Sequence, residues 1–341
     1  MQAKRDGTES EAPDESRQSS VAEKISIYNF LPVALLGEGT YGQVFLVEDI
    51  NTGKMYAMKK LDKREIEEQN MMRYTQTERN ILASIDHPFI VKLFYAFQTS
   101  KYFFLIQEYC PCGDVSKMLK RKKKLSEHEA RLYIAEVLLA IEHLHSNGII
   151  YRDLKPDNII IGEDGHLKLT DFGLSKENAD SDFTSNSFVG TYAYAAPEVL
   201  KQKAHGKSLD WYLLGALLYE FLVGLPPYYD KDQELMNDNI ISGALKMPRL
   251  LSEEAKDLIQ RLLKRNPMDR IGAGADGASE IKAHPFFDTI KWDDIINKRT
   301  KLTFKSKKKV VRQDIPIDAY IEAIGTADEN RVENWSFIRQ Q

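Results

Sequence analysis

Short apolar runs separated by turn residues dominate the chain between about residues 25 and 109. Runs such as QVFLVED and YFFLIQEY have the length and the aromatic and β-branched content of strands, and turn residues such as those at 51–53 lie between them. One helical pattern interrupts the strands over residues 63–85, where Ile81 and Ile85 recur at helical spacing. This part of the chain therefore predicts a small, β-rich lobe that carries one main helix.

The pattern becomes helical after about residue 114. Ser126 and Glu129 form a capping box ahead of the amphipathic run ARLYIAEVLLAIEHLH. A β-hairpin is predicted around residues 158–169, and further helices extend to about residue 287. The apolar stretch at 212–229 contains a glutamate and ends in tyrosines after two prolines. Because a membrane span needs about 20 mostly apolar, uncharged residues, a buried core helix is the better interpretation.

These changes of pattern divide the chain into five expected segments. The first is rich in Ser, Glu, Asp and Gln with almost no large apolar residue, which predicts disorder. The rest predicts an α+β fold of two lobes, with a small β-rich N-lobe joined through a hinge to a larger, mostly helical C-lobe, followed by a tail. The expected bounds are 1–24 for the disordered segment, 25–109 for the N-lobe, 110–114 for the hinge, 115–290 for the C-lobe and 291–341 for the tail.

Composition narrows the class of protein. The 341 residues include 47 Lys plus Arg and 51 Asp plus Glu, a net charge of −4, which argues against a protein that coats nucleic acid. Two cysteines, Cys110 and Cys112, cannot build a disulfide framework, so a reducing compartment is favoured. The N-terminus is charged and has no apolar stretch typical of a secretory signal. We therefore expect a monomer located in the cytoplasm, with the nucleus as a second location, and neither a transmembrane segment nor nucleic acid as a partner.

A glycine-rich segment offers a candidate phosphate site. Residues 37–44 match G-x-G-x-x-G-x-V, and glycines allow backbone N–H groups to approach phosphate oxygens. A dinucleotide-binding fold would need a helix directly after the glycines, whereas the run FLVED continues as a strand. The glycines are thus expected in a β-hairpin over a ligand, although any tight strand turn can be glycine-rich. The residues predicted to contact the ligand here are Gly37, Glu38, Gly39, Thr40, Tyr41, Gly42 and Val44.

Four further residues complete a candidate reaction centre. Lys59 lies on an apolar strand, and Glu78 follows 19 residues later in the helical segment, where it can pair with the lysine and fix it against phosphates. Asp153 and Asn158 lie on one loop, and Asp171 follows across the predicted hairpin. Asn158 and Asp171 supply the oxygen ligands that Mg²⁺ prefers, which leaves Asp153 free to accept a hydroxyl proton. A polar turn with helix caps is the plainer interpretation.

In this order along the chain, the motifs resemble those of eukaryotic protein kinases, from about Tyr28 to Phe287. The resemblance implies ATP as phosphate donor, with Mg²⁺, and adenine contacts from Ala57, Glu108 and Cys110. Lys155, two residues after Asp153, is similar to the serine/threonine-specific pattern, in which it meets the γ-phosphate and Thr191 bonds nearby. The family's counterparts of Glu198 and Arg270 form a buried ion pair, and that of Asp210 holds the catalytic loop. Gln107 would stand at the back of the adenine pocket.

Tyr151 and the segment at 266–287 resemble the AGC group, and most of all its branch with protein kinase B and the serum/glucocorticoid-regulated kinases. That resemblance implies two phosphorylation sites. Ser187 occupies the activation-loop position, where a phosphate would bind Arg152 and Lys176. Ser336 lies in a sequence similar to the hydrophobic motif that docks beside the Glu78 helix and that an upstream activating kinase would use. A loop serine and an ordinary exposed tail are the simpler alternatives.

The resemblance also implies which substrates are used. Asp114, Asp157 and Glu220 match positions at which AGC kinases bind arginines upstream of the target hydroxyl, and acids suit guanidinium groups. We therefore expect protein substrates with Arg three residues before Ser or Thr. Two alternatives stay open, a pseudokinase scaffold that binds nucleotide or partners without turnover and a small-molecule kinase. The basic run at 120–124 is interpreted as a solvated surface patch.

Overall fold

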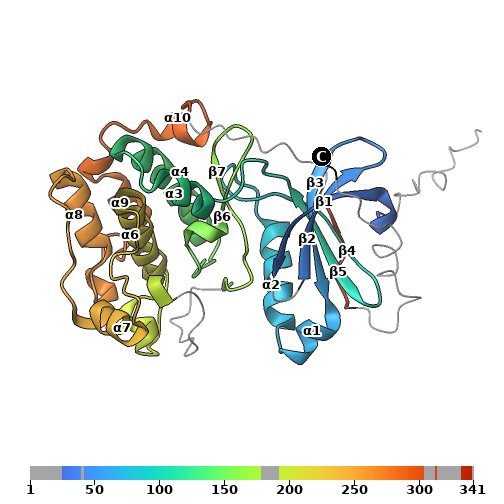
Figure 1. Cartoon of the computed structure of the whole chain (residues 1–341), viewed down its shortest axis with the longest axis horizontal. Helices are drawn as coiled ribbons and strands as arrows, with labels where there is room; N and C mark the ends of the chain where they lie inside the picture. The colour runs from blue at the N-terminus through green and yellow to red at the C-terminus, as the bar shows by residue number, and fades with distance from the viewer. Residues whose placement is uncertain (1–24, 40–41, 178–191, 303–311, 313–331, 340–341) are drawn as a thin grey trace, which may run out of the picture.

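The computed structural model describes residues 25–39, 42–177, 192–302, 312 and 332–339. Two lobes lie side by side, one built around a β-sheet and the other mostly of helices (Figure 1). This architecture confirms the predicted α+β fold with a small β-rich lobe and a larger helical lobe. The proposed disordered segment at 1–24 and most of the proposed tail lie outside the described residues.

The small lobe is organised by a six-stranded antiparallel sheet in the order β1-β2-β3-β5-β4-β8. Aromatic and aliphatic side chains cover both faces, with Tyr56, Met58 and Phe104 in one cluster and Leu61 and Phe103 in the other. The last strand comes from the tail and extends the sheet by pairing with β4. The strands are β1 (Phe30–Gly39), β2 (Gly42–Asp49), β3 (Met55–Asp62), β4 (Leu93–Gln98), β5 (Tyr102–Glu108) and β8 (Phe337–Ile338).

The helical segment predicted at 63–85 is two helices, α1 (Lys63–Glu68) and α2 (Met72–Ser84). Asp62 caps α1 by accepting hydrogen bonds from the backbone N–H groups of the first turn. Asn70 then adopts a left-handed conformation with φ of 55°, which a helix cannot continue through. The prediction of a single helix was therefore wrong at this turn, while α2 is the main helix that the pattern indicated.

In the apolar run at 89–98, strand β4 begins only at Leu93. The preceding residues bond to the large lobe instead. The N–H of Val91 donates to the Leu169 carbonyl, and the N–H of Leu169 donates to the Phe89 carbonyl, both at 2.9 Å. This segment therefore ties the two lobes together behind the hinge.

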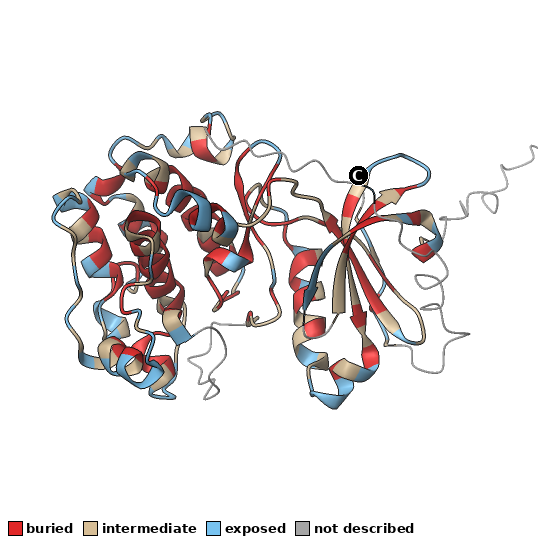
Figure 2. Ribbon diagram, viewed as in Figure 1, coloured by how far each residue is buried: buried red, intermediate tan, exposed pale blue. Residues whose placement is uncertain are grey.

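Helices that bury most of their apolar surface form the large lobe (Figure 2). The predicted capping box is confirmed, since the N–H of Glu129 donates to the Ser126 hydroxyl and the Ser126 N–H donates to the Glu129 carboxylate. Gly224, in a left-handed conformation, ends the central helix. The helices are α3 (Val115–Lys122), α4 (Glu127–Ser146), α5 (Pro197–Leu200), α6 (Ser208–Val223), α7 (Gln233–Ser242), α8 (Glu253–Leu262), α9 (Ala278–Lys282) and α10 (Trp292–Ile296).

The apolar stretch that opens near Tyr212 is the buried helix α6, as predicted, and nearly all of its residues are inaccessible to solvent. None of the helices in the described residues has the length and apolar character needed to span a membrane. The predicted hairpin is also present, as β6 (Ile159–Ile161) paired with β7 (Leu167–Leu169). This hairpin carries the loop residues of the candidate site to the side of the large lobe that faces the sheet (Figure 1).

Candidate active site

Residues from both lobes line one cavity of about 580 Å³. Strands β1 to β3 form one side, the segment after β5 forms the back, and the loop residues next to β6 and β7 form the other side. The sequence-predicted residues that line it are Gly37, Val44, Ala57, Lys59, Glu78, Glu108, Cys110, Asp114, Asp157, Asn158 and Asp171. The fold therefore gathers at one place residues that are far apart in the sequence.

Other predicted residues lie nearby or elsewhere. Glu38, Gly39 and Gly42 belong to the glycine-rich hairpin, and Asp153 and Lys155 lie next to Asn158. Thr40, Tyr41, Ser187 and Thr191 fall outside the described residues. Ser336 is exposed on the tail beside α2, away from the cavity.

The glycine-rich segment forms a β-hairpin, as predicted, with Gly39 paired to Gly42. A side chain at Gly42 would collide with the carbonyl of Lys60 on β3, so only glycine fits there. The amide of Gln43 donates to the Glu38 carboxylate across the hairpin at 2.8 Å. This arrangement holds the hairpin against β3, next to the strand that carries Lys59.

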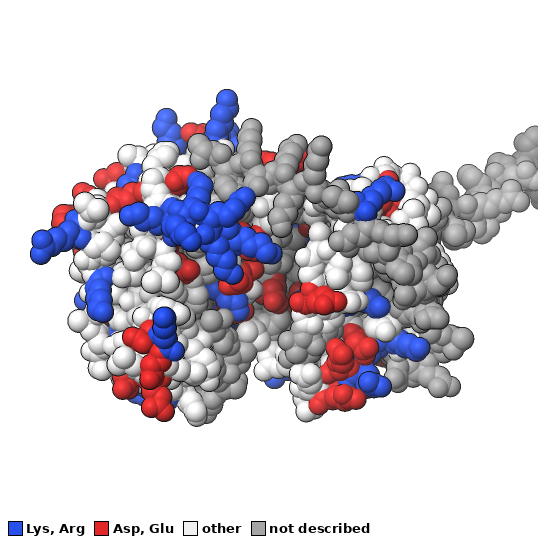
Figure 3. Space-filling view, in the orientation of Figure 1, with Lys and Arg blue, Asp and Glu red and all other residues white. Residues whose placement is uncertain are grey.

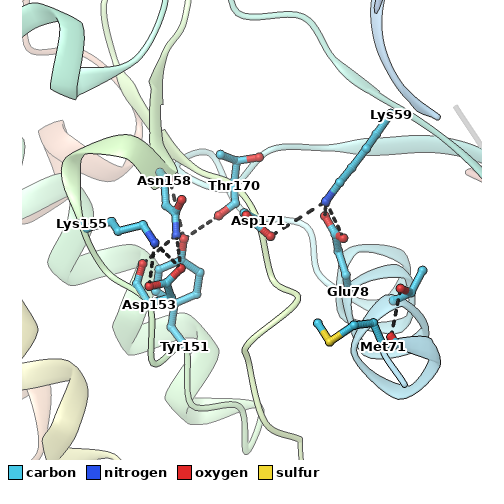
Figure 4. A network of polar contacts seen from close by, with 10 residues as sticks. Lys59, Met71, Glu78, Tyr151, Asp153, Lys155, Asn158, Thr170 and Asp171 are labelled. Carbon is cyan, nitrogen blue, oxygen red and sulfur yellow. Dashed lines mark hydrogen bonds and ion pairs between the residues drawn. The ribbon is translucent and has the colours of Figure 1, made fainter. Parts of the chain in front are cut away.

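Lys59 and Glu78 form the ion pair that their spacing predicted. The ammonium of Lys59 donates to both Glu78 oxygens at 2.8 and 2.7 Å, and it lies 3.9 Å from an Asp171 oxygen (Figure 4). Burial alone would lower the pKa of Lys59, but the Glu78 and Asp171 carboxylates raise it to about 12. Lys59 is therefore a fixed cation at the cavity wall, presented by β3 and held from α2.

Asp153, Lys155 and Asn158 form a second polar group (Figure 4). The Lys155 ammonium donates to both Asp153 oxygens at 3.0 and 2.8 Å. The Asn158 amide nitrogen donates to the Asp153 backbone carbonyl at 2.9 Å and to its carboxylate at 2.6 Å. Burial raises the pKa of Asp153, although Lys155 and Asn158 oppose the shift. A buried carboxylate held by two neighbours has the character of a proton acceptor.

The loop that carries Asp153 is held by a single buried carboxylate. Asp210, fully buried on α6, accepts the backbone N–H of Tyr151 at 2.9 Å and that of Arg152 at 2.8 Å, and it bonds to His145 at 2.7 Å. Arg152 adopts φ of 69°, an uncommon conformation for a residue with a side chain. These bonds fix the loop in that conformation, which agrees with the role expected of Asp210.

The buried ion pair expected between Glu198 and Arg270 is present. Two guanidinium nitrogens of Arg270 donate to the two Glu198 oxygens, each at 2.6 Å, and both side chains are inaccessible to solvent or nearly so. Such a bidentate pair joins α5 to the segment before α9. The pair therefore fixes α5, close to where the described part of the chain resumes at residue 192.

The donor set fits Mg²⁺. The Asn158 nitrogen is bonded to Asp153, so its carbonyl oxygen is the end that remains for a ligand. Asp171, whose side chain is half exposed, adopts φ of 58° and lines the same cavity. One carboxylate and one amide oxygen are too few for a magnesium ion by themselves, and phosphate oxygens normally complete such a site. Asn158 and Asp171 would thus hold the metal against a bound phosphate.

The hinge region contains an interaction that the sequence analysis missed. The ammonium of Lys168, on β7, lies 3.0 Å from the Glu108 carboxylate and donates to the Pro88 carbonyl at 2.9 Å. A lysine in the strand LKL is typical of a surface residue, so no pattern in the sequence indicated this contact.

The thiol of Cys110 also lies at the hinge. Burial raises the pKa of Cys110 to about 12, with Glu108 adding to the effect, which keeps the thiol protonated.

The three predicted substrate acids differ in their environments. Asp114 caps α3, and its carboxylate already accepts the N–H of Lys117 at 2.7 Å and its ammonium at 2.6 Å. Asp157 is exposed at the cavity edge. Glu220 has a buried carboxylate oxygen without a hydrogen-bond partner among the described residues. Burial, with Asp157 adding to it, raises the pKa of Glu220 to about 7.

The end of the tail docks on the small lobe as the motif implied. Trp335 is buried against Phe103, with ring centroids 4.1 Å apart, and its indole N–H donates to the Phe97 carbonyl at 2.9 Å. Phe337 belongs to β8, and Val332 bonds through its backbone to Gln98. The tail therefore docks beside α2 although Val332 replaces the first aromatic residue of the motif.

The basic run at the end of α3 lies on the surface. Figure 3 shows Lys and Arg side chains gathered on the face of the large lobe near α3, whose last turn carries Lys120, Arg121 and Lys122. Lys122 pairs with Glu129. These contacts agree with the interpretation of a solvated patch.

Comparison with known proteins places this fold and site in a class. A profile of the protein kinase domain family matches residues 30–287, so the chain belongs to that family. The match spans strands β1 to β5 of the sheet, the hinge and most of the helical lobe, and it leaves out β8. It also contains all the residues that line the cavity.

Individual relatives refine the class. Human ribosomal protein S6 kinase alpha-2 is 46% identical over 286 residues, which cover 83% of this chain and 39% of that protein. Ribosomal protein S6 kinase alpha-6 of Danio rerio is 44% identical over 303 residues, 88% of this chain and 41% of that protein. Human ribosomal protein S6 kinase alpha-1 is 44% identical over 287 residues. The chain thus spans about 40% of the length of the curated relatives it matches.

These relatives agree with part of the group resemblance. Ribosomal S6 kinases are AGC-group kinases, and this chain is similar to them over the matched residues. They do not single out the branch with protein kinase B and the serum/glucocorticoid-regulated kinases. The protein kinase domain family is therefore shown, while the AGC group and its branch stay predictions.

Proposed function

We propose that this chain transfers the γ-phosphate of Mg-ATP to serine or threonine hydroxyls of protein substrates. One observation carries the proposal. The Lys59–Glu78 ion pair and the Asn158–Asp153 bond lie around one cavity, with Asp171 between them. A pseudokinase scaffold needs none of these contacts to be maintained. The intact set therefore favours turnover.

Each residue has a distinct task in this proposal. Lys59 binds the phosphates nearest the base, and Glu78 holds its ammonium in place. Asp153 orients the substrate hydroxyl and accepts its proton, while Lys155 neutralises charge at the transferred phosphate. Mg²⁺, held by Asn158 and Asp171, would neutralise charge on the phosphate oxygens. Phosphoryl transfer then depends on positioning and electrostatics rather than on covalent chemistry.

The proposed substrates carry arginine upstream of the phosphorylated residue. Glu220 supports this preference most strongly, because its buried carboxylate oxygen has no hydrogen-bond partner among the described residues and a guanidinium group would pair with it. Asp157 adds negative charge next to it. Asp114 contributes less, since Lys117 already neutralises it.

Regulation by phosphorylation is part of the same proposal. Burial lowers the pKa of Lys176, and the positive charges of Arg152 and of Arg73 on α2 lower it further. Such a group of cations suits a phosphate on Ser187. The docked tail supports Ser336 as a second phosphorylation site, which an upstream kinase would use. The protein kinase B branch and a cytoplasmic location are also part of this proposal.

Phosphorylation of a peptide library by the full chain, compared with Asp153→Asn, tests the proposal. The wild type should phosphorylate Ser and Thr peptides with Arg three residues upstream and lose at least tenfold in kcat/KM when that Arg becomes Ala. The Asp153→Asn chain should be inactive while still binding ADP. Transfer to a metabolite but to no peptide, or ADP binding without any transfer, would show that the proposal is wrong.

A further inference from the structure

A buried amide without a partner stands at the back of the cavity. Gln107 is the second-last residue of β5 and is only 8% exposed. Its side-chain nitrogen has no hydrogen-bond partner among the described residues. Buried donors in folded proteins are almost always paired, and leaving one unpaired is costly. This nitrogen is therefore in the position of a group that a ligand completes.

The sheet register directs Gln107 to the cavity. Gln107 lies directly opposite Ala57, and Leu105 lies opposite Lys59, in the antiparallel pair of β3 and β5. Opposite residues of such a pair share a face of the sheet, and so do residues two apart on one strand. Gln107 therefore shares the face of Ala57 and Lys59, and all three line the cavity.

The position of Gln107 relative to Lys59 identifies the part of the nucleotide that it meets. In the proposed function, which this inference rests on, Lys59 binds phosphate, and the base occupies the back of the cavity beside Glu108 and Cys110. A glutamine amide presents one donor and one acceptor side by side. That pair matches the N7 acceptor and N6 amino donor of adenine, whereas guanine offers two acceptors, N7 and O6.

We infer that the Gln107 amide reads the N6–N7 edge of the purine and makes nucleotide choice specific for adenine. Its nitrogen donates to N7, and its oxygen accepts from the N6 amino group. The hydrogen bonds are formed only when adenine is bound, so the free protein keeps an unpaired amide. Guanine would place its O6 against the amide oxygen, and inosine would do the same, which disfavours both.

A double-mutant cycle between Gln107 and the base tests the inference by binding, independently of turnover. Calorimetry on the full chain with Mg²⁺ would measure Kd for ADP, 7-deaza-ADP, which lacks N7, and IDP, which replaces the N6 amino group by a carbonyl. The protein variant is Gln107→Met, which keeps the side-chain length. For at least one of the two base changes, the increase in Kd relative to ADP should be about 3- to 10-fold larger for the wild type than for Gln107→Met.

The matched control is Gln98→Met. Gln98 is a glutamine on the neighbouring strand β4, whose amide nitrogen already donates to the Val332 carbonyl at 2.7 Å and which does not line the cavity. This variant should show the same penalties for 7-deaza-ADP and IDP as the wild type. Gln107→Met should also raise the Tm of the nucleotide-free chain by roughly 2–4 °C, because an unpaired buried amide is removed.

The outcomes separate this inference from the proposed function. If wild type and Gln107→Met both bind ADP and lose affinity equally for both base changes, Gln107 does not contact the base edge. The inference is then wrong, while the proposed function stands. If the wild type binds no ADP at all, the proposed function fails and the inference fails with it. A loss of affinity for 7-deaza-ADP or IDP that is smaller in Gln107→Met, but not in Gln98→Met, than in the wild type supports the inference.

Discussion

Glu78 and Arg79 are consecutive residues of α2 that face different parts of the molecule. Glu78 is buried toward the cavity, where it binds Lys59. Arg79 points to the tail, where it donates to the carbonyls of Trp335 at 2.9 Å and Ser336 at 3.2 Å, and also to that of Asn334. Because successive residues of a helix are about 100° apart, one turn of α2 contacts both the proposed phosphate site and the tail.

The two contacts differ in kind. On the cavity side a buried carboxylate is matched by one ammonium, and removing either leaves an unpaired charge, which is among the most damaging changes in a protein. On the tail side a partly exposed guanidinium binds neutral carbonyls, so each bond contributes less. The comparison shows that α2 is anchored strongly at the cavity and held in place more weakly by the tail. The tail is therefore the side on which its position can be adjusted.

Removing the cavity-side contact should have the largest effect. Lys59→Met should lower kcat/KM for peptide phosphorylation about 100- to 1,000-fold, because the phosphates lose their positioning cation. The control is Lys60→Met, since Lys60 projects from the other face of β3 and stacks over Tyr102. Steady-state kinetics should show the control within a few fold of the wild type. A similar loss in both variants would mean that the cavity face has no special role.

Removing the main tail anchor should come next. Trp335→Ala deletes a buried indole and its hydrogen bond, and should lower the free energy of unfolding by about 3 kcal/mol. Chemical denaturation would measure it. Ile338→Ala, at an exposed position of β8, should cost less than about 0.5 kcal/mol. If both changes had equal effects, the tail would not be anchored by its aromatic residue.

The guanidinium contact should contribute less than the indole. Arg79→Ala should lower stability by about 1–2 kcal/mol and increase amide hydrogen exchange at 334–338, because three carbonyls lose a donor. Arg79→Lys should rescue little, since one ammonium cannot span three carbonyls. Unchanged exchange in Arg79→Ala would show that α2 and the tail are not linked through this residue.

Glu220 provides the contrast to Glu78 and the smallest expected effect, because its buried carboxylate oxygen has no partner within the described ranges. The raised pKa of Glu220, about 7, means that its carboxylate ionises as pH rises from 6 to 8. The KM ratio between an Ala-substituted peptide and the Arg peptide should therefore rise, by at most about tenfold, over that range. Using the ratio cancels the titration of Asp153. Glu220→Gln should flatten the profile, and an equal rise in that variant would exclude Glu220 as the cause.

The sequence was sufficient for the parts of the molecule that depend on local pattern or fixed spacing. The glycine hairpin, the capping box at Ser126 and the buried helix α6 follow from periodicity and turn chemistry, and the Lys59–Glu78 pair follows from the order of motifs. The break at Asn70 was not predicted, because asparagine is tolerated in helices and only the tertiary path required a left-handed residue there.

Contacts that depend on side-chain neighbours were beyond the sequence. Nothing in a strand reading LKL indicates that Lys168 binds Glu108 in the hinge. Likewise, Asp114, Asp157 and Glu220 look equivalent as acids. Yet Lys117 neutralises the first, the second is exposed, and the third has a buried oxygen with no partner in the part of the chain that the structure describes. Such differences arise from distance and burial, which residue type alone does not encode.

The most direct test of the account is the single-turnover rate of phosphoryl transfer from Mg-ATP to a serine peptide with arginine three residues upstream. It would be measured on the full chain and on Asp153→Asn, with ADP affinity determined by calorimetry on the same samples. The account predicts a loss of about 1,000-fold or more in rate, with ADP affinity unchanged within about threefold. A rate in Asp153→Asn equal to that of the wild type would contradict it.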